Sequence, residues 1–202
     1  CSTMSRRHPL LAAILAVAWL LPACTTTPQA DFYALDTGGR VSPGTRSQLI
    51  VAIGPVDLPQ YLDRPHIVSR TGGNRLRVDE FNRWAGSLEE DVTRVLTRRV
   101  GDRLGTLRVY GYPSRVVVDT DYRVAVDVRA FDGALGGEVV LEASWAVLDD
   151  RAGRVVQTRQ ASYRGVAQGD GYDAYTAALS ALLGQLGDDL AAVIGDLPRP
   201  GG

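Results

Sequence analysis

Acidic residues stand next to one another at several places in the sequence, and paired carboxyl groups can do acid–base chemistry. Three such groups are Glu89-Glu90-Asp91, Asp149-Asp150 and Asp188-Asp189. A general acid and a general base must both face the same cleft to act on a substrate. Contiguous side chains on a helix or at a turn diverge, so we interpret all three groups as solvated surface.

Other reactive side chains are scarce. After position 23 the sequence contains one histidine, His66, and one cysteine, Cys24, and the whole chain contains no lysine. His66 follows Pro65 at the start of an expected strand, where a lone histidine is typically structural. The sequence therefore predicts no metal site, no Ser–His or Cys–His nucleophile pair, no P-loop and no cofactor. We expect a protein that is not an enzyme.

Cys24 is the residue for which the sequence does predict a modification. It closes an apolar run that follows Arg6 and Arg7, as in a secretory signal peptide, and the run is too short to span a membrane. Leu21-Pro22-Ala23-Cys24 matches the lipobox of bacterial lipoprotein precursors. We expect residues 1–23 to be a lipoprotein signal peptide, and Cys24 to carry a covalent diacylglycerol and an N-acyl lipid. The alternative is an ordinary signal peptide followed by a chance cysteine.

The residue after Cys24 predicts the location of the anchor. Thr25 is not the aspartate that retains many such lipoproteins in the inner membrane, so we expect an outer-membrane anchor with the domain at the periplasmic face. The formal net charge of the chain is −1 and its arginines form no concentrated basic block. Nucleic acid is therefore not an expected partner.

The rest of the chain is expected to form one domain. Residues 24–47 would hold the lipidated cysteine, a polar tether and a first edge strand at Asp31–Leu35, and the domain itself would cover residues 31–197. The apolar run Leu49–Ile53 predicts a strand buried on both faces. A hairpin is expected from His66 to Val78, with its turn at Thr71-Gly72-Gly73-Asn74.

Two long amphipathic helices are predicted from apolar residues at three- and four-residue spacing. The first would begin near Phe81, with Asp79 or Asn82 as its cap, and end before Gly105. The second would run from Tyr172 to Ile194 and carries many small residues, which would let it pack closely on a sheet or on another helix.

Alternating segments predict the remaining strands. A strand is expected at Thr106–Tyr110, and three more are expected to form an antiparallel meander, with Tyr122, Val124, Val126, Val128 and Ala130 sharing one face of its first strand. One mixed sheet would supply the surface on which both helices bury their apolar stripes. The predicted fold class is α/β, as a single domain.

Several of these segments together resemble a known family. They are Phe32-Tyr33-Ala34-Leu35, the stretch from Ile53 to Pro65 with its Pro59-Gln60-Tyr61-Leu62-Asp63-Arg64-Pro65 sequence, Arg83-Trp84, Trp145 and Tyr172-Asp173-Ala174-Tyr175. The chain resembles the ABC-type transport auxiliary lipoproteins over nearly all of its length after the signal segment. The stretch ending in Pro65 is the most specific part of the likeness.

The resemblance implies a fold, a function and partners. The fold would be a three-layer α/β arrangement similar to the amino-terminal domain of the translocation protein TolB. The chain would be a non-enzymatic outer-membrane subunit of an MCE/ABC-type system that moves lipids between the two membranes and supports envelope integrity. Its partner would be the MCE-domain protein of that system, and it could assemble as a homo-oligomeric ring. An outer-membrane lipoprotein regulator of peptidoglycan synthesis is the alternative.

The proline-stiffened loop after Ile53 supplies candidate partner-binding residues. Leu58, Tyr61 and Leu62 are large apolar residues whose docking would cost little conformational entropy, and Arg64 adds a planar donor of the kind enriched at interfaces. The alternative is that the loop folds back over a sheet edge, with Tyr61 buried and Arg64 paired internally.

Overall fold

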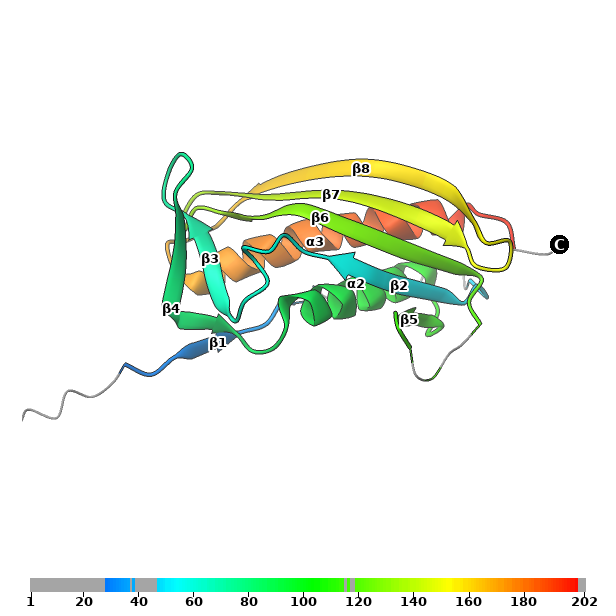
Figure 1. Ribbon diagram of the computed structural model, residues 1–202, viewed down its shortest axis with the longest axis horizontal. Coiled ribbons are helices and arrows are strands. Elements are labelled where there is room, and N and C mark those ends of the chain that lie inside the picture. The colour runs from blue at the N-terminus through cyan, green and yellow to red at the C-terminus, as the bar shows by residue number, and fades with distance from the viewer. Residues whose placement is uncertain (1–27, 37, 39–46, 115, 117–118, 200–202) are drawn as a thin grey trace, which may run out of the picture.

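The computed structural model describes residues 28–36, 38, 47–114, 116 and 119–199. The expected signal peptide and Cys24 lie outside the described residues. Figure 1 shows a long twisted sheet over two helices, with a smaller sheet across one end of them.

The larger sheet has five strands in the order β5-β2-β6-β7-β8. Their bounds are Val109–Gly111 for β5, Val51–Asp57 for β2, Tyr122–Gly133 for β6, Glu138–Asp149 for β7 and Arg154–Val166 for β8. The last three strands pair antiparallel, which confirms the predicted meander. β2 pairs in parallel with both β5 and β6 and runs beyond the expected end at Ile53, through Gly54 and Pro55.

The smaller sheet corrects the prediction of a single sheet. It has the order β1-β4-β3, with β1 at Asp31–Tyr33, β4 at Leu76–Trp84 and β3 at His66–Arg70. β1 is an edge strand and pairs in parallel with the end of β4, while β3 and β4 form the predicted hairpin.

The first helix begins later than predicted. α2 runs from Leu88 to Leu104, and Ser87 caps it by accepting a hydrogen bond from the backbone N–H of Glu90. Phe81 and Trp84 belong to β4, because the end of this strand pairs with β1 and the Trp84 N–H donates to the Pro65 carbonyl. The predicted end is confirmed, since Gly105 has φ +63° after the last turn.

The second helix, α3, runs from Tyr172 to Gly195 as predicted. Its length and apolar composition would suffice to cross a membrane, but half of that stretch is buried within the domain, where it packs on α2, β7 and β8. Close packing on α2 is possible because Gly187 has no side chain: a Cβ there would come within 2.7 Å of Arg99 Cγ. The expected role of the small residues is thus confirmed.

Both helices lie on the same face of the five-stranded sheet (Figure 1). The five-stranded sheet and the two helices form two packed layers, with the smaller sheet across one end of the helices. The inward face of β6 carries Tyr122, Val124, Val126 and Val128, as predicted. A bulge then changes the alternation, so Phe131 is buried in place of Ala130.

Candidate functional site

The loop that was expected to bind a partner lies where the two sheets meet. Leu62 is 2% exposed and belongs to the core, so it is wrong as a contact residue. Leu58 and Tyr61 are partly buried against the core. Arg64 is exposed and forms no ion pair with any residue that the structure describes.

Asp132 is the buried centre of this junction. It lies on β6 and is 1% exposed. The Arg70 guanidinium from β3 donates to both of its carboxylate oxygens, with Nη2 3.0 Å from Oδ2, and the Tyr61 hydroxyl donates to Oδ2. Burial, followed by this hydrogen bond, raises the pKa of Tyr61 well above the ordinary value for tyrosine. The loop is therefore fastened to both sheets through one carboxylate.

Tyr175 of α3 closes the junction from the helical side. It is fully buried, and its hydroxyl donates to the Val68 carbonyl at 2.8 Å and accepts the Gly133 N–H at 3.1 Å. These bonds join β3 and β6, one from each sheet. The polar side-chain groups of Tyr61, Arg70, Asp132 and Tyr175 have partners in one another or in the backbone, so we interpret the junction as structural.

The paired acidic residues do not converge on a common site. Asp188 on α3 accepts hydrogen bonds from Arg99 and Arg103 on α2, with N–O distances of 2.6 to 2.8 Å. Burial alone would raise the pKa of Asp188, but the two arginines outweigh it and lower this pKa to about 2. Asp91 accepts the Leu35 N–H and pairs with Arg94.

No group of three or more histidine, cysteine or acidic residues within the described ranges is placed to hold a metal ion. Among the same residues, the acidic groups pair with arginines and accept backbone N–H groups. These contacts stabilise the surface of the fold.

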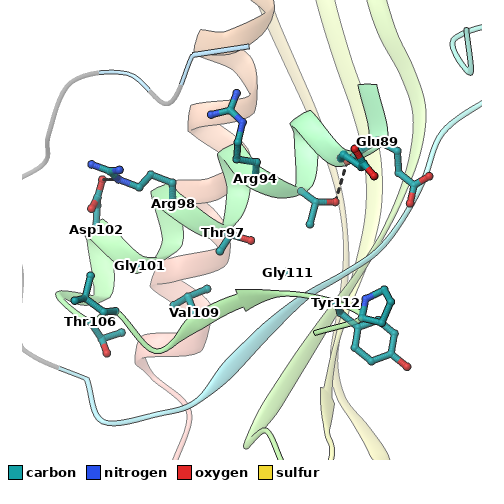
Figure 2. A pocket seen from close by; sticks show the side chains of 14 residues that line it. Glu89, Arg94, Thr97, Arg98, Gly101, Asp102, Thr106, Val109, Gly111 and Tyr112 are labelled. Carbon is teal, nitrogen blue, oxygen red and sulfur yellow. Dashed lines mark hydrogen bonds and ion pairs between the residues drawn. The ribbon is translucent and has the colours of Figure 1, made fainter. Parts of the chain in front are cut away.

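An open groove of about 910 Å³ lies between α2 and β5, and sequence reasoning did not predict it (Figure 2). Its helical wall includes Glu89, Arg94, Thr97 and Asp102. The other wall is formed by the segment from Thr106 to Pro113, which contains β5. The signal that could have indicated the groove is a row of small residues at four-residue spacing on α2: Thr93, Thr97 and Gly101.

This row sets how closely the two walls approach. A Cβ at Gly101 would lie 3.0 Å from the Thr106 carbonyl oxygen, and one at Gly111 would lie 3.2 Å from Thr93 Cγ2. The base of the groove is thus narrow. Figure 2 shows Thr97 directed from α2 toward β5, with Tyr112 at one end of the groove and Thr106 at the other.

The groove retains polar groups without partners. The Thr97 hydroxyl oxygen is buried and makes no hydrogen bond in the described structure. Arg94 pairs with Asp91 and Arg98 pairs with Asp102, whereas Glu89 and Glu90 form no ion pair with a described residue. The groove therefore differs from the junction in leaving hydrogen-bonding and charged groups available.

Comparison with known proteins gives a consistent result. The model of a family described as "ABC-type transport auxiliary lipoprotein component" matches residues 33–191. The Intermembrane transport lipoprotein PqiC of Escherichia coli K12 is 24% identical over 186 residues, which cover 91% of this chain and 96% of the relative. A relative of the same name from Shigella flexneri aligns equally well.

Two solved structures share the fold. One, described as an uncharacterized protein, has a TM-score of 0.68 at 20% identity and covers 83% of this chain and 99% of its own. The other is a Xanthomonas campestris protein of the DUF330 family, with a TM-score of 0.68 at 22% identity, covering 82% of this chain and 94% of its own. The mixed α/β architecture with two helices is therefore shared with these proteins.

Proposed function

The chain belongs to the ABC-type transport auxiliary lipoprotein family, and from this premise we propose that it is a non-enzymatic subunit of an MCE/ABC-type system that moves lipids between the inner and outer membranes. The observation that carries the proposal is the family match across residues 33–191, which includes all of α2, all of α3 except its last turn, and every strand from β2 to β8. The name of the PqiC relatives, intermembrane transport lipoprotein, supports the same class of function.

The proposed attachment is through lipid on Cys24 to the periplasmic face of the outer membrane. The described domain begins close to this cysteine, since β1 starts at Asp31. At about 3.3–3.6 Å per residue, the seven residue steps from Cys24 to Asp31 reach roughly 25 Å at most. The anchor would therefore hold the domain close to the membrane surface, where it could receive a partner that crosses the periplasm.

The proposed partner is the MCE-domain protein of the same system, and the lipoprotein would assemble on it as a homo-oligomeric ring. Leu58, Tyr61 and Arg64 remain proposed contact residues, because each keeps part of its side chain at the surface. Leu62 is left out because it is buried.

Affinity purification tests the proposal and its alternative together. The full chain with a carboxy-terminal tag is purified from detergent-solubilised envelopes, and co-purifying proteins are quantified by mass spectrometry against an untagged strain. We expect enrichment of an MCE-domain protein with its permease and ATPase. Enrichment of peptidoglycan synthases without the MCE-domain protein would overturn the proposal in favour of a role in cell-wall synthesis.

The anchor has its own test. Cys24→Ala should abolish incorporation of labelled palmitate and move the protein out of the outer-membrane fraction. Retained label and unchanged fractionation in Cys24→Ala would contradict lipidation at this residue, whatever the purification finds.

A further inference from the structure

The side of β5 that faces the groove has unpaired backbone groups. β5 is the edge of the five-stranded sheet, and among the described strands it pairs with β2 alone. The Arg108 carbonyl and the Tyr112 N–H bond to β2, which assigns residues 108, 110 and 112 to that side of the strand. The N–H and C=O groups of Val109 and Gly111 therefore point away from β2, and they make no hydrogen bond to any residue that the structure describes.

The surroundings of this edge fit an added strand. The groove follows the chain from Thr106 to Pro113, and the extended part of this segment is β5 itself, Val109–Gly111. A strand beside β5 would have one face toward α2, where it would meet Thr93, Thr97 and the stems of Arg94 and Arg98. Side chains at alternate positions would face α2, and those between them would face solvent.

The charges that line the groove indicate which peptide would fit. The two arginines are neutralised by Asp91 and Asp102, so the uncompensated charges are those of Glu89 and Glu90. Carboxylates are favourable in the first turn of a helix, which accounts for their presence but leaves them free to pair with a ligand. Glu89 lies at the Tyr112 end of the groove (Figure 2), and Glu90 follows it in the first turn of α2, so a basic residue would be favoured there.

We propose that the groove between α2 and β5 binds an extended peptide segment of a partner protein, which adds a strand to β5. The Val109 and Gly111 backbone groups pair with the segment, its medium-sized side chains lie over Thr93 and Thr97, and a basic side chain faces Glu89 and Glu90. Exposed edges of this kind are used for peptide recognition by strand addition. The proposal names a docking surface for the transport partner and in that respect rests on the proposed function.

A synthetic peptide tests the groove without any transport protein. The probe is a fluorescein-labelled octapeptide of alternating threonine and valine with two arginines at one end, made with the arginines at either terminus. Binding to the detergent-solubilised full chain is measured by fluorescence anisotropy, and hydrogen exchange reports protection of the Val109 and Gly111 amides. We expect saturable binding of one of the two peptides, together with slower exchange at both amides.

Two variants and a matched control locate the binding site. Val109→Pro removes an outward N–H that β2 does not use, and Glu89→Arg with Glu90→Arg reverses the free charges. Each should weaken binding by about tenfold or more, as loss of two exposed charge pairs or of a strand hydrogen bond would. Glu80→Arg, at an exposed glutamate on β4, should leave binding unchanged. Thermal unfolding checks that the variants are folded. If Val109→Pro does not fold, the charge-reversal variant still tests the proposal.

Other outcomes would overturn the proposal. It fails if neither peptide binds, if a peptide with proline at alternate positions binds equally well, or if Glu80→Arg weakens binding as much as the groove variants do. Concentration-dependent self-association that Val109→Pro abolishes would show that a second copy of the chain occupies the edge. Co-purification of the MCE-domain protein that survives all groove variants would overturn this docking surface alone and leave the proposed function intact.

Discussion

The junction between the two sheets and the groove between α2 and β5 contain similar polar groups. These groups are paired with one another at the junction, whereas several in the groove are not. At the junction, Asp132 has three donated hydrogen bonds from Tyr61 and Arg70. In the groove, neither the Thr97 hydroxyl nor the outward backbone groups of Val109 and Gly111 find a partner among the residues that the structure describes. Polar groups that satisfy one another stabilise a fold, whereas groups left without partners at a concave surface are available to a ligand.

Whether polar groups have partners is a better guide to a binding surface than side-chain exposure alone. The loop with Leu58 and Tyr61 looked like a docking element because it carries large apolar residues, yet its polar contacts bind it to the sheets. The sequence does not indicate the groove, because the side chains that line it are mostly small or charged. The structure nevertheless combines a free strand edge with uncompensated glutamates there. The following predictions test whether the two regions differ as described.

Asp132→Ala should have the largest effect, because it leaves Arg70 and Tyr61 without their shared acceptor. Arg70 keeps 40% of its side chain exposed, so we expect a loss of about 3 kcal/mol in the free energy of unfolding, at the lower end for a broken buried pair. Urea unfolding followed by tryptophan fluorescence measures it. Asp127→Ala, at an exposed aspartate on the same strand, is the control and should change stability by less than about 0.5 kcal/mol. Equal effects of the two variants would show that the junction is not a stabilising cluster.

Asp188→Asn should cost about 2 kcal/mol at pH 7, because the charged carboxylate accepts hydrogen bonds from two arginines on the helix that also lines the groove. The pKa of Asp188 is about 2 in the folded protein, below the unfolded value near 3.9. A lowered pKa stabilises the folded state above the unfolded value, and this contribution is lost as the pH falls from about 4 to 2. The difference between wild type and variant should therefore shrink over that range in urea unfolding. A difference that stays constant from pH 6 to pH 2.5 would contradict the assignment.

Tyr61→Phe should cost about 1 kcal/mol, since it removes one hydrogen bond from Asp132 while Arg70 still occupies the carboxylate. The same variant sharpens the comparison in a second way. If the exposed part of Tyr61 contacts a partner through its ring alone, binding to the MCE-domain protein should be unchanged in Tyr61→Phe and weakened in Tyr61→Ala. Loss of stability in both variants with no change in binding in either would assign Tyr61 to the fold only.

Much of the fold was predictable because it follows from local periodicity. The meander is confirmed because its strands alternate cleanly and are joined by short loops, and α3 is confirmed from Tyr172 because its apolar spacing is regular. The division into two sheets was not predictable in this way. It depends on the parallel pairing of β1 with β4, which joins segments about fifty residues apart.

The start of α2 was misread for a specific physical reason. Phe81 and Trp84 continue the apolar spacing of the helix by coincidence, but the pairing with β1 and the hydrogen bond from Trp84 N to the Pro65 carbonyl keep this stretch extended. A better signal was present in Ser87 followed three residues later by Glu90, the pattern of a helix cap. The groove could not be predicted, because a strand becomes an edge only through the order of strands in the sheet.

Thr97→Val should give the smallest effect and, unlike the others, a gain. The Thr97 hydroxyl oxygen is buried without a partner, so replacing it by a methyl group of similar size should remove a desolvation cost and raise the free energy of unfolding by up to about 1 kcal/mol. Thr93→Val, one turn earlier on the same row, is the matched control. Its hydroxyl donates to the Glu89 carbonyl at 2.9 Å, so its loss should be neutral or slightly destabilising. Urea unfolding of both variants gives the comparison directly. A Thr97→Val variant that is less stable than Thr93→Val would show that the Thr97 hydroxyl is already satisfied in the free protein, and the groove would then lose one of the features that set it apart from the junction.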